Sequence, residues 1–531
     1  MKILILFSIN ILFFLKVSSQ SVDWMWASSP SSSNVNIIEG CISVDNSSNL
    51  YVCGGFRHGS VTFGSYTLTC SATDEMFLAK YAPNGNVLWA KDFVGTTNAN
   101  SGALVCTDVF ENVYAVGGFS DTLFFGSDTL ISHYGVDIIA VKYDSSGNVI
   151  WTRDLGGPGQ GTNINSIATA PLGSVYITGY TQDTIFTIGS FTFTNPIGNY
   201  VFIAKFDSSG TVLWAKVTGG ATANGGNAVA TDGLENVYLS GYFTVPYLVF
   251  GNDTVHQTGT HAYFLVKFDS GGNTLWAKNT GSTFGGGDNY LVTDADNNVY
   301  ETYQDMYSDF SFFSKFNSSG NLIWSKADTS NYLYPNGLAT DKHGKIYFAG
   351  DFVSDTIKLD TVTLIKPHSS IGCYIIEFDS SGTAIWGKTI LSGSNYPLSV
   401  AVASSECIYA AGGFIASPFI LGNDTLIPSS ANENVFVGKL CFSGFGENIS
   451  ETKKNNGVVV YPNPFDTKLT VATKVDGEFE LTLFDVTSRK IFNRSFINSA
   501  TINTEQLARG MYFYEVRCKN DVEERGKLVK E

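Results

Sequence analysis

The sequence has few of the residue clusters that mark nucleic-acid, metal or redox sites. Its 32 Lys and Arg residues are outnumbered by 48 Asp and Glu residues, which gives a formal charge of −16. Phosphate binding needs clustered cations and none are visible, so we expect no nucleic-acid partner. The eight cysteines include no C-x-x-C pair, and the six histidines form no H-E-x-x-H motif. We therefore expect neither a metal nor a cofactor.

Long apolar runs are missing after the N-terminus. Lys2 precedes an apolar run from Ile3 to Leu15 that only Ser8 and Asn10 interrupt, and small residues follow at 17–19. This pattern predicts a signal peptide over residues 1–19, with a retained anchor as the alternative. No other segment approaches the roughly 20 apolar residues of a membrane helix, so we expect no membrane span in the mature chain.

Most of the remaining chain repeats one phrase, close to N-V-Y-x-x-G-x-F and followed by F-x-x-K-[FY]-D-S-S-G-N-x-x-W. Its tyrosines are Tyr51, Tyr114, Tyr176, Tyr238, Tyr300, Tyr347 and Tyr409. In the copy from Asn227 to Gly281, four short runs rich in branched and aromatic residues are bounded by turn residues, as strands are. Seven such units predict an all-β fold, a seven-bladed β-propeller over residues 20–446.

The two ends of the repeat array complement each other. The seventh unit has no W-A-K strand after Cys441. Residues 23–27 (D-W-M-W-A) resemble that strand, but they precede the first unit. We expect this N-terminal strand to complete the last blade and close the propeller, because pairing removes two exposed sheet edges. The fifth unit is about 15 residues shorter than the others. The missing piece lies between its second and third strands, which predicts the loss of one projecting hairpin.

The repeated polar residues are explained by structural roles in turns. Asp45, Asp108, Asp232, Asp294 and Asp341 recur six residues before their tyrosines; a ring of carboxylates is the alternative, but turn chemistry explains them. The D-S-S-G-N runs are tight turns rather than calcium loops, which need a fuller ligand set. Cys41 and Cys53 fall on adjacent predicted strands, so they are either disulfide-bonded or buried free thiols.

The pattern changes at Gly457. V-V-V-Y-P-N-P-F at 458–465 is followed by L-T-L-F-D at 481–485, L-A-R-G-M-Y at 507–512 and K-L-V-K at 527–530. This segment resembles the C-terminal sorting domain, type A, of type IX secretion substrates in Bacteroidota, although Ser488 stands where that family has Gly. The alternative is an adhesion module of immunoglobulin type. The residues carrying the resemblance are Tyr461, Pro462, Asn463, Pro464, Gly510, Tyr512, Lys527 and Lys530.

The resemblance implies a small β-sandwich over residues 457–531, after a polar linker at 447–456. It also implies export by the type IX secretion machinery, removal of this domain by the associated sortase, and either release or attachment at the outer cell surface. Residues 27–446 likewise resemble bacterial SBBP-type β-propeller repeats, a resemblance that names no reaction.

The candidate binding residues are amides at one register position. Asn165, Asn227, Asn289 and Asn336 stand eleven residues before their tyrosines. Amides suit hydroxyl-rich or peptide ligands, so we expect a monomeric protein that binds a glycan or a protein through one loop face. Asn caps at the start of each first strand are the alternative. A second reading is a hydrolase or lyase at the channel mouth, but no catalytic set stands out, so an enzyme is the less favoured interpretation.

Seven D-T-[LIV] triplets resemble the acceptor sequence for O-glycosylation in Bacteroidota, and they are also ordinary turn endings. The threonines that we expect in projecting hairpins are Thr129, Thr254 and Thr425.

Overall fold

The computed structural model describes residues 21–32, 36–93, 103–125, 128–132, 136–155, 161–195, 198–220, 224–283, 289–305, 310–328, 333–341, 343–366, 372–390, 399–403, 407–415, 419–428, 434–443, 458–461, 465, 467–473, 477–485, 489–518 and 521–530. The predicted signal peptide, the predicted linker and residues 462–464 lie outside these ranges. The chain divides into two compact units, Met1–Gly444 and Phe445–Glu531. Every regular element in the described ranges is a β-strand, so the predicted all-β class is confirmed.

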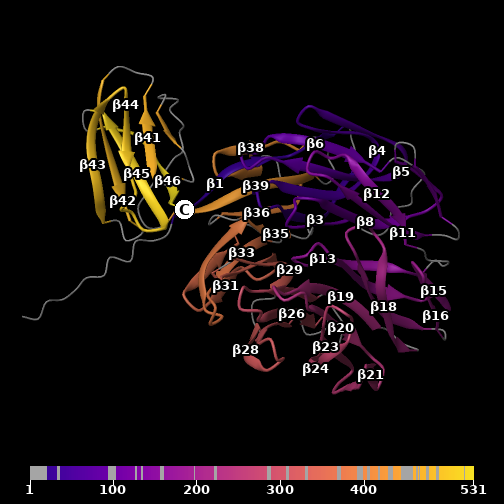
Figure 1. Cartoon of the computed structure of the whole chain (residues 1–531). Helices are drawn as coiled ribbons and strands as arrows, with labels where there is room; N and C mark the ends of the chain where they lie inside the picture. Colours follow the sequence, from indigo (N-terminus) through magenta and orange to yellow (C-terminus); the bar gives the residue numbers. More distant parts are fainter. Residues whose placement is uncertain are drawn as a thin grey trace, which may run out of the picture. The chain divides into compact units, whose positions relative to one another are not determined.

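The larger unit is a series of sheets in which strands adjacent in the sequence pair antiparallel (Figure 1). We number its repeat units by their order in the chain. Unit one contains β3 (Asn36–Val44), β4 (Leu50–Phe63), β5 (Tyr66–Tyr81) and β6 (Val87–Asp92), and the short β2 (Ser31–Ser32) also pairs with β4. Unit two contains β7 (Leu104–Thr107), β8 (Val113–Phe119), β11 (Asp137–Tyr143) and β12 (Val149–Asp154). Unit three contains β13 (Asn163–Thr169), β14 (Val175–Thr181), β17 (Asn199–Phe206) and β18 (Val212–Gly220).

The later units repeat this order. Unit four contains β19 (Asn224–Thr231), β20 (Val237–Phe243), β23 (His261–Phe268) and β24 (Thr274–Thr283). Unit five contains β25 (Asn289–Thr293), β26 (Val299–Asp305), β27 (Phe310–Phe316) and β28 (Leu322–Asp328). Unit six contains β29 (Leu333–Thr340), β30 (Ile346–Phe352), β33 (Gly372–Phe378) and β34 (Ala384–Ile390). Unit seven contains β35 (Ser399–Val402), β36 (Cys407–Phe414) and β39 (Asn434–Ser443), and its fourth strand is β1 (Ser21–Ser28).

Short hairpins project between the second and third strands of most units. They are β9 (Thr122–Phe125) with β10 (Asp128–Ile131), β15 (Ile185–Ile188) with β16 (Phe191–Thr194), β21 (Tyr247–Phe250) with β22 (Asp253–His256), β31 (Thr356–Leu359) with β32 (Val362–Ile365), and β37 (Phe419–Leu421) with β38 (Asp424–Leu426). In unit one the long strands β4 and β5 supply the hairpin themselves. In unit five only residues 306–309 separate β26 from β27, which confirms the predicted loss of a hairpin.

The strand sequences account for how deeply each strand of a unit is buried. Second and third strands such as β8 and β11 are buried along their whole length, because both of their faces are covered and they carry near-continuous apolar runs. Fourth strands such as β28 alternate between exposed and half-buried residues, as a sheet edge does.

Contacts between units run through the first strands. Each of β3, β7, β13, β19, β25 and β29 contacts the next first strand in the chain, and β35 contacts both β29 and β3. Threonine hydroxyls reinforce several of these contacts. Thr169 Oγ1 donates to the Thr107 carbonyl at 2.6 Å and Thr231 Oγ1 to the Thr169 carbonyl at 2.6 Å. Thr293 Oγ1 donates in turn to the Thr231 carbonyl at 2.6 Å.

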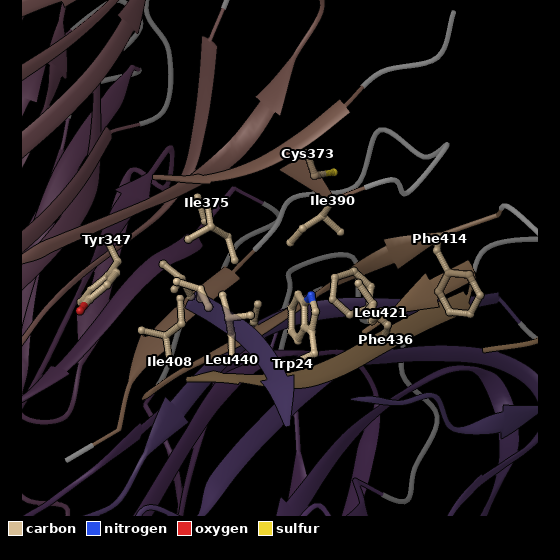
Figure 2. Close-up of a cluster of buried hydrophobic side chains, with 14 of the residues drawn as sticks. Trp24, Tyr347, Cys373, Ile375, Ile390, Ile408, Phe414, Leu421, Phe436 and Leu440 are labelled. Carbon is tan, nitrogen blue, oxygen red and sulfur yellow. The ribbon is translucent and has the colours of Figure 1, made fainter. Parts of the chain in front are cut away.

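The N-terminal strand pairs with the last strand of the repeat array, as predicted. In the β1–β39 ladder Trp26 lies opposite Lys439 and Ser28 opposite Val437, and Figure 1 shows the two strands side by side. The Ala27 N–H also donates to Asp424 Oδ2 at 2.7 Å, in the hairpin of unit seven. Figure 2 shows the Trp24 side chain among apolar residues of units six and seven, including Ile390 and Leu440.

One disulfide, Cys407–Cys441, joins facing residues of β36 and β39. Cys41 and Cys53 face each other on β3 and β4 with their sulfurs 3.6 Å apart and are not bonded, so the free-thiol alternative holds for this pair. The pairing of Cys407 with Cys441 was not predicted.

The C-terminal unit contains two sheets. One consists of β40 (Val459–Tyr461), β41 (Lys468–Ala472) and β44 (Ser499–Asn503), and the other of β43 (Lys490–Ile497), β42 (Glu478–Phe484), β45 (Gly510–Cys518) and β46 (Asp521–Lys530). Leu469 and Val471 from the first sheet share one apolar cluster with Leu481, Leu483 and Val516 from the second. Shared burial of this kind is how two sheets form a sandwich.

Candidate functional site

The repeated Asp residues hold turns and buried partners, as turn chemistry predicts. Asp232 Oδ1 accepts the N–H groups of Leu234 and Asn236 at 2.9 Å each. Its Oδ2 accepts the Tyr238 hydroxyl at 3.2 Å and lies 3.0 Å from Lys267 Nζ. Burial raises the pKa of Asp232, but hydrogen bonds from Asn236 and Lys267 outweigh it and leave that pKa below the usual value. All of these contacts are internal to the turn and its neighbours, so this carboxylate is structural.

The D-S-S-G turns between third and fourth strands are also self-contained. Asp144 Oδ1 accepts the N–H groups of Ser146 and Asn148 at 2.9 and 2.8 Å, and Gly147 has a φ of 82°, which a tight turn requires. Among the described residues, no group of three or more His, Cys, Asp or Glu side chains is placed to hold a metal ion.

The carbonyls of these turns receive side chains from the preceding unit. In units one to five, a Lys from the third strand and a Trp from the fourth both donate to one Ser carbonyl of the next unit. Lys205 Nζ and Trp214 Nε1, for example, lie 2.9 and 3.1 Å from the Ser270 oxygen. Each of these tryptophans therefore makes a specific hydrogen bond to the neighbouring unit. The strand β1 takes part in the same way, since Trp26 Nε1 donates to the Pro83 carbonyl of unit one at 2.9 Å.

The four candidate amides do not form one exposed row. Asn165, Asn227 and Asn336 sit at bulges of their first strands, where the ladder register shifts. Asn165 is exposed and donates to the Gly226 carbonyl of the next unit at 3.0 Å, and Asn336 donates to Asp351 Oδ2 at 3.0 Å. Asn289 is only 2% exposed and donates to Ser240 Oγ at 2.6 Å. A ligand role for these four residues stays a proposal.

Three strands extend into segments whose glycine content is typical of loops. The stretches Gly219–Asn227 and Gly281–Asn289 are rich in glycine, yet β18 continues to Gly220, β19 already begins at Asn224, and β24 continues to Thr283. The Asn224 amide explains part of this extension, because it donates to the carbonyls of Asn199 and Gly220 at 2.9 and 3.0 Å. The connections between these strands are therefore shorter than the glycine content suggests.

A row of aromatic rings crosses from unit four to unit five at this face. Tyr263 stacks on Tyr303 with centroids 4.3 Å apart, and Tyr303 stacks on Phe312 at 4.8 Å. The row continues within unit four through Tyr242, whose ring lies 6.4 Å from Tyr263 and 6.2 Å from His261. Tyr263 and Tyr303 are buried, whereas Tyr242, His261 and Phe312 are half-buried. The sequence signal for this row is Tyr242, which stands in unit four where units one, two and seven have the second Gly of the phrase G-G-F.

Unit five also buries an acid. Glu301 lies one residue after Tyr300, where the other units carry apolar residues, and its side chain is 0% exposed. Burial raises its pKa to about 8, and the Thr280 hydroxyl and the Asn289 amide oppose the rise. Burial thus favours the protonated, uncharged form of this carboxyl, which lies at the contact between units four and five.

The predicted modification and sorting residues lie as follows. Thr129, Thr254 and Thr425 are exposed on the second strands of their hairpins. Tyr461 ends β40, Lys527 lies on β46, and Gly510 begins β45 with a φ of 145°. Tyr512 is buried and donates to the Ala508 carbonyl at 2.6 Å, while Lys530 Nζ lies 5.9 Å from the centre of the Phe465 ring. Pro462, Asn463 and Pro464 are outside the described residues.

Comparison with known families decides the assignment. Residues 459–531 match the family described as secretion system C-terminal sorting domain, and residues 150–187 match the family described as beta-propeller repeat, SBBP. The chain contains an SBBP β-propeller repeat and a C-terminal type IX sorting domain. That sorting domain indicates export and a secreted or outer-surface location. No helix in the described part of the chain has the length and apolarity to cross a membrane.

Individual relatives are distant. A protein described as an uncharacterized WD repeat-containing protein of Acanthamoeba polyphaga mimivirus is 26% identical over 331 residues, which cover 50% of this chain and 24% of that protein. A solved structure of unknown function from Dyadobacter fermentans is 7% identical with a TM-score of 0.40, covering 79% of this chain and 99% of the other. An ulvan lyase bound to an oligosaccharide is 11% identical with a TM-score of 0.40, covering 74% and 93%. Similarity at this level does not indicate the activity of this chain.

Proposed function

We propose that this protein is a secreted or surface-displayed binding module whose larger unit is a closed seven-bladed β-propeller. The observation that supports closure is the cycle of first-strand contacts, which returns from β35 to β3. The pairing of β1 with β39 and the bond from Trp26 to Pro83 support the same arrangement, because they give unit seven a fourth strand. The closed ring is then a rigid scaffold, and its loops are free to vary.

The ligand that we propose is a glycan, with a protein segment as the other outcome, bound at the face where the aromatic row lies. Strand pairing places Asn224 opposite Phe243 and His261 opposite Thr283, so the hairpins and the fourth-to-first loops leave the sheets at the same edge. Half-buried aromatic rings beside amides suit a sugar, which offers an apolar face and several hydroxyl groups. The row is the single observation that favours a glycan.

A glycan array with the purified mature chain tests this proposal. We expect reproducible binding that Tyr242→Ala and His261→Ala each weaken by about tenfold, since each removes one aromatic contact. Tyr180→Ala is the matched control, because Tyr180 is half-buried at the same position of unit three and lies outside the row. The double change Asn227→Ala with Asn289→Ala tests the amides separately.

Binding that ignores both row variants would reject the proposed surface, and binding to proteins alone would replace the glycan with a protein partner. Turnover of a polysaccharide or peptide by the purified chain would favour the hydrolase or lyase reading. We propose that the type IX machinery and its sortase act on the C-terminal unit, and that the mature protein is a monomer.

A further inference from the structure

Two cavities occupy equivalent places in the contacts between neighbouring units. One, of about 250 Å³, lies between units three and four, and the other, of about 270 Å³, lies between units five and six. Each is bounded by the third and fourth strands of one unit and by the hairpin of the next. Equivalent lining residues, named first for units three and four and then for units five and six, are Ile203 and Phe313, Lys216 and Lys326, Leu239 and Phe348, Gly251 and Asp360, and Phe268 and Phe378.

The two cavities differ in one wall. Phe193, from the hairpin of unit three itself, lines the first cavity. Unit five has no such hairpin, and the residues lining the second cavity come from its strands and from unit six. The shortened fifth unit therefore leaves the second cavity without the side that Phe193 provides in the first.

The interior of the second cavity is aromatic. Phe313, Phe348 and Phe378 are all nearly buried, and the centroid of the Phe313 ring lies 4.7 Å from that of Phe348 and 5.3 Å from that of Phe378. In the equivalent cavity the first two positions carry Ile203 and Leu239. A further planar ring can add tilted or edge-on contacts with these rings. For scale, a cavity of about 150 Å³ holds benzene, so 270 Å³ accommodates a six-membered ring with a short side chain.

Opposite charges meet at the mouth. Lys326 Nζ lies 3.2 Å from Asp360 Oδ2, and the two side chains remain 39% and 37% exposed, so each has room for a second partner. Asp360 also accepts the Ala384 N–H at 2.8 Å, which with Lys326 holds the pKa of this carboxyl below its usual value. Its φ is 49°, whereas the equivalent residues in units one, three, four and seven are glycines with φ between 56° and 63°. A charged side chain thus replaces the glycine that this left-handed backbone favours.

We propose that this cavity binds a free aromatic α-amino acid, with the ring among the three phenylalanines, the carboxylate beside Lys326 and the ammonium beside Asp360. A zwitterion matches the paired charges at the mouth, and the aromatic ring matches the interior. The proposal does not depend on the glycan surface of unit four.

Titration calorimetry of the mature chain with L-phenylalanine tests the site. We expect a dissociation constant of about 1 mM or tighter, which is modest for a ligand of this size. Phenylacetate lacks the ammonium and 2-phenylethylamine lacks the carboxylate, so each should bind about fivefold or more weakly, as expected for loss of one partly exposed ion pair. L-leucine, without a ring, should bind more weakly than L-phenylalanine.

Three variants localise the site. Asp360→Gly restores the glycine of the other hairpins and should remove the preference for an ammonium group. Lys326→Ala should remove the preference for a carboxylate. Leu359→Phe places in this hairpin the residue found at Phe250 in unit four, and it should fill the cavity and abolish binding. Lys216→Ala, at the equivalent position of the first cavity, is the control and should leave binding unchanged.

No saturable binding of L-phenylalanine up to about 10 mM, a range that covers weak sites, would overturn the proposal. Binding that survives Leu359→Phe would overturn it as well, provided that the variant keeps the wild-type circular dichroism spectrum. If Leu359→Phe fails to fold, Asp360→Gly is the deciding variant. The assignment would be rejected if this variant preferred L-phenylalanine over phenylacetate by the same factor as the wild type.

Discussion

The N-terminal strand should contribute several kcal/mol to stability through one side chain, Trp24. Its indole is 7% exposed and packs against apolar residues from units six and seven (Figure 2). About 200 Å² of buried tryptophan surface, at about 25 cal/mol per Å², corresponds to about 5 kcal/mol. Replacing a buried Trp or Phe with Ala costs about 3–5 kcal/mol once a cavity remains. Trp24→Ala should therefore lower the free energy of unfolding by about 4 kcal/mol.

Urea unfolding of the full chain, followed by far-UV circular dichroism, measures this effect on the transition of the larger unit. Met25→Ala is the matched control, because Met25 is the next residue of the same strand and is 62% exposed. It should change the free energy of unfolding by no more than about 0.5 kcal/mol. If the two variants shift the midpoint equally, β1 is not part of the folded core and the proposed closure of the propeller is wrong.

Three further predictions follow from single contacts. Asp232→Ala should cost about 3–5 kcal/mol, because it removes the buried carboxylate that pairs with Lys267 and accepts the Tyr238 hydroxyl. Asp269→Ala, at an exposed turn, should cost about 1 kcal/mol. Urea midpoints compare the two variants, and equal losses would contradict the buried network. Reducing Cys407–Cys441, which spans 34 residues, should lower stability by about 2–4 kcal/mol in wild type and by nothing in Cys407→Ser. Because the pKa of Glu301 is about 8 in the fold and ordinarily 4.5, the native state keeps a proton that the unfolded chain releases, so stability should fall as pH rises from about 4.5 to 8. Glu301→Gln should remove this fall, and an unchanged pH profile would contradict the assignment.

The repeat phrase was sufficient to predict the strands because each unit carries its own boundaries. Turn residues such as Asp232 and Asp144 bond their own backbone two and four residues on, so local chemistry fixes where strands begin and end. The pairing of the N-terminal strand with the last strand of the repeat array was predicted from a missing strand, and it is confirmed. The all-β class, the propeller repeat and the sorting domain are likewise confirmed, whereas the closed ring of seven blades and the domain boundaries stay predictions.

Features that depend on contacts between units could not be predicted from one unit at a time. The extension of β18 to Gly220 requires the Asn224 amide from across the loop, and no periodicity signals it. The stacking of Tyr263 on Tyr303 joins residues 40 positions apart in a pair of units. Asn289 had the register of a ligand-binding amide, yet the same register turns it inward to Ser240. Residues at the same register position of the repeat need not be equally exposed, because packing between units decides which side chains face solvent.

The irregularities of unit six follow from where the chain starts. In units one to five a third-strand Lys donates to the turn carbonyl of the next unit, but unit seven has no such turn, because its fourth strand is β1 and comes from the N-terminus. A Lys at that position in unit six would be buried without its carbonyl, which is costly. Glu377 stands there instead, and Lys345 replaces the usual Asn, so that the two form an ion pair of 2.8 Å. Trp386, without a carbonyl to reach, packs edge-on against Phe442 of β39 at 5.1 Å. Three departures from the repeat thus have one physical cause, the replacement of a hairpin by two chain segments more than 400 residues apart in sequence.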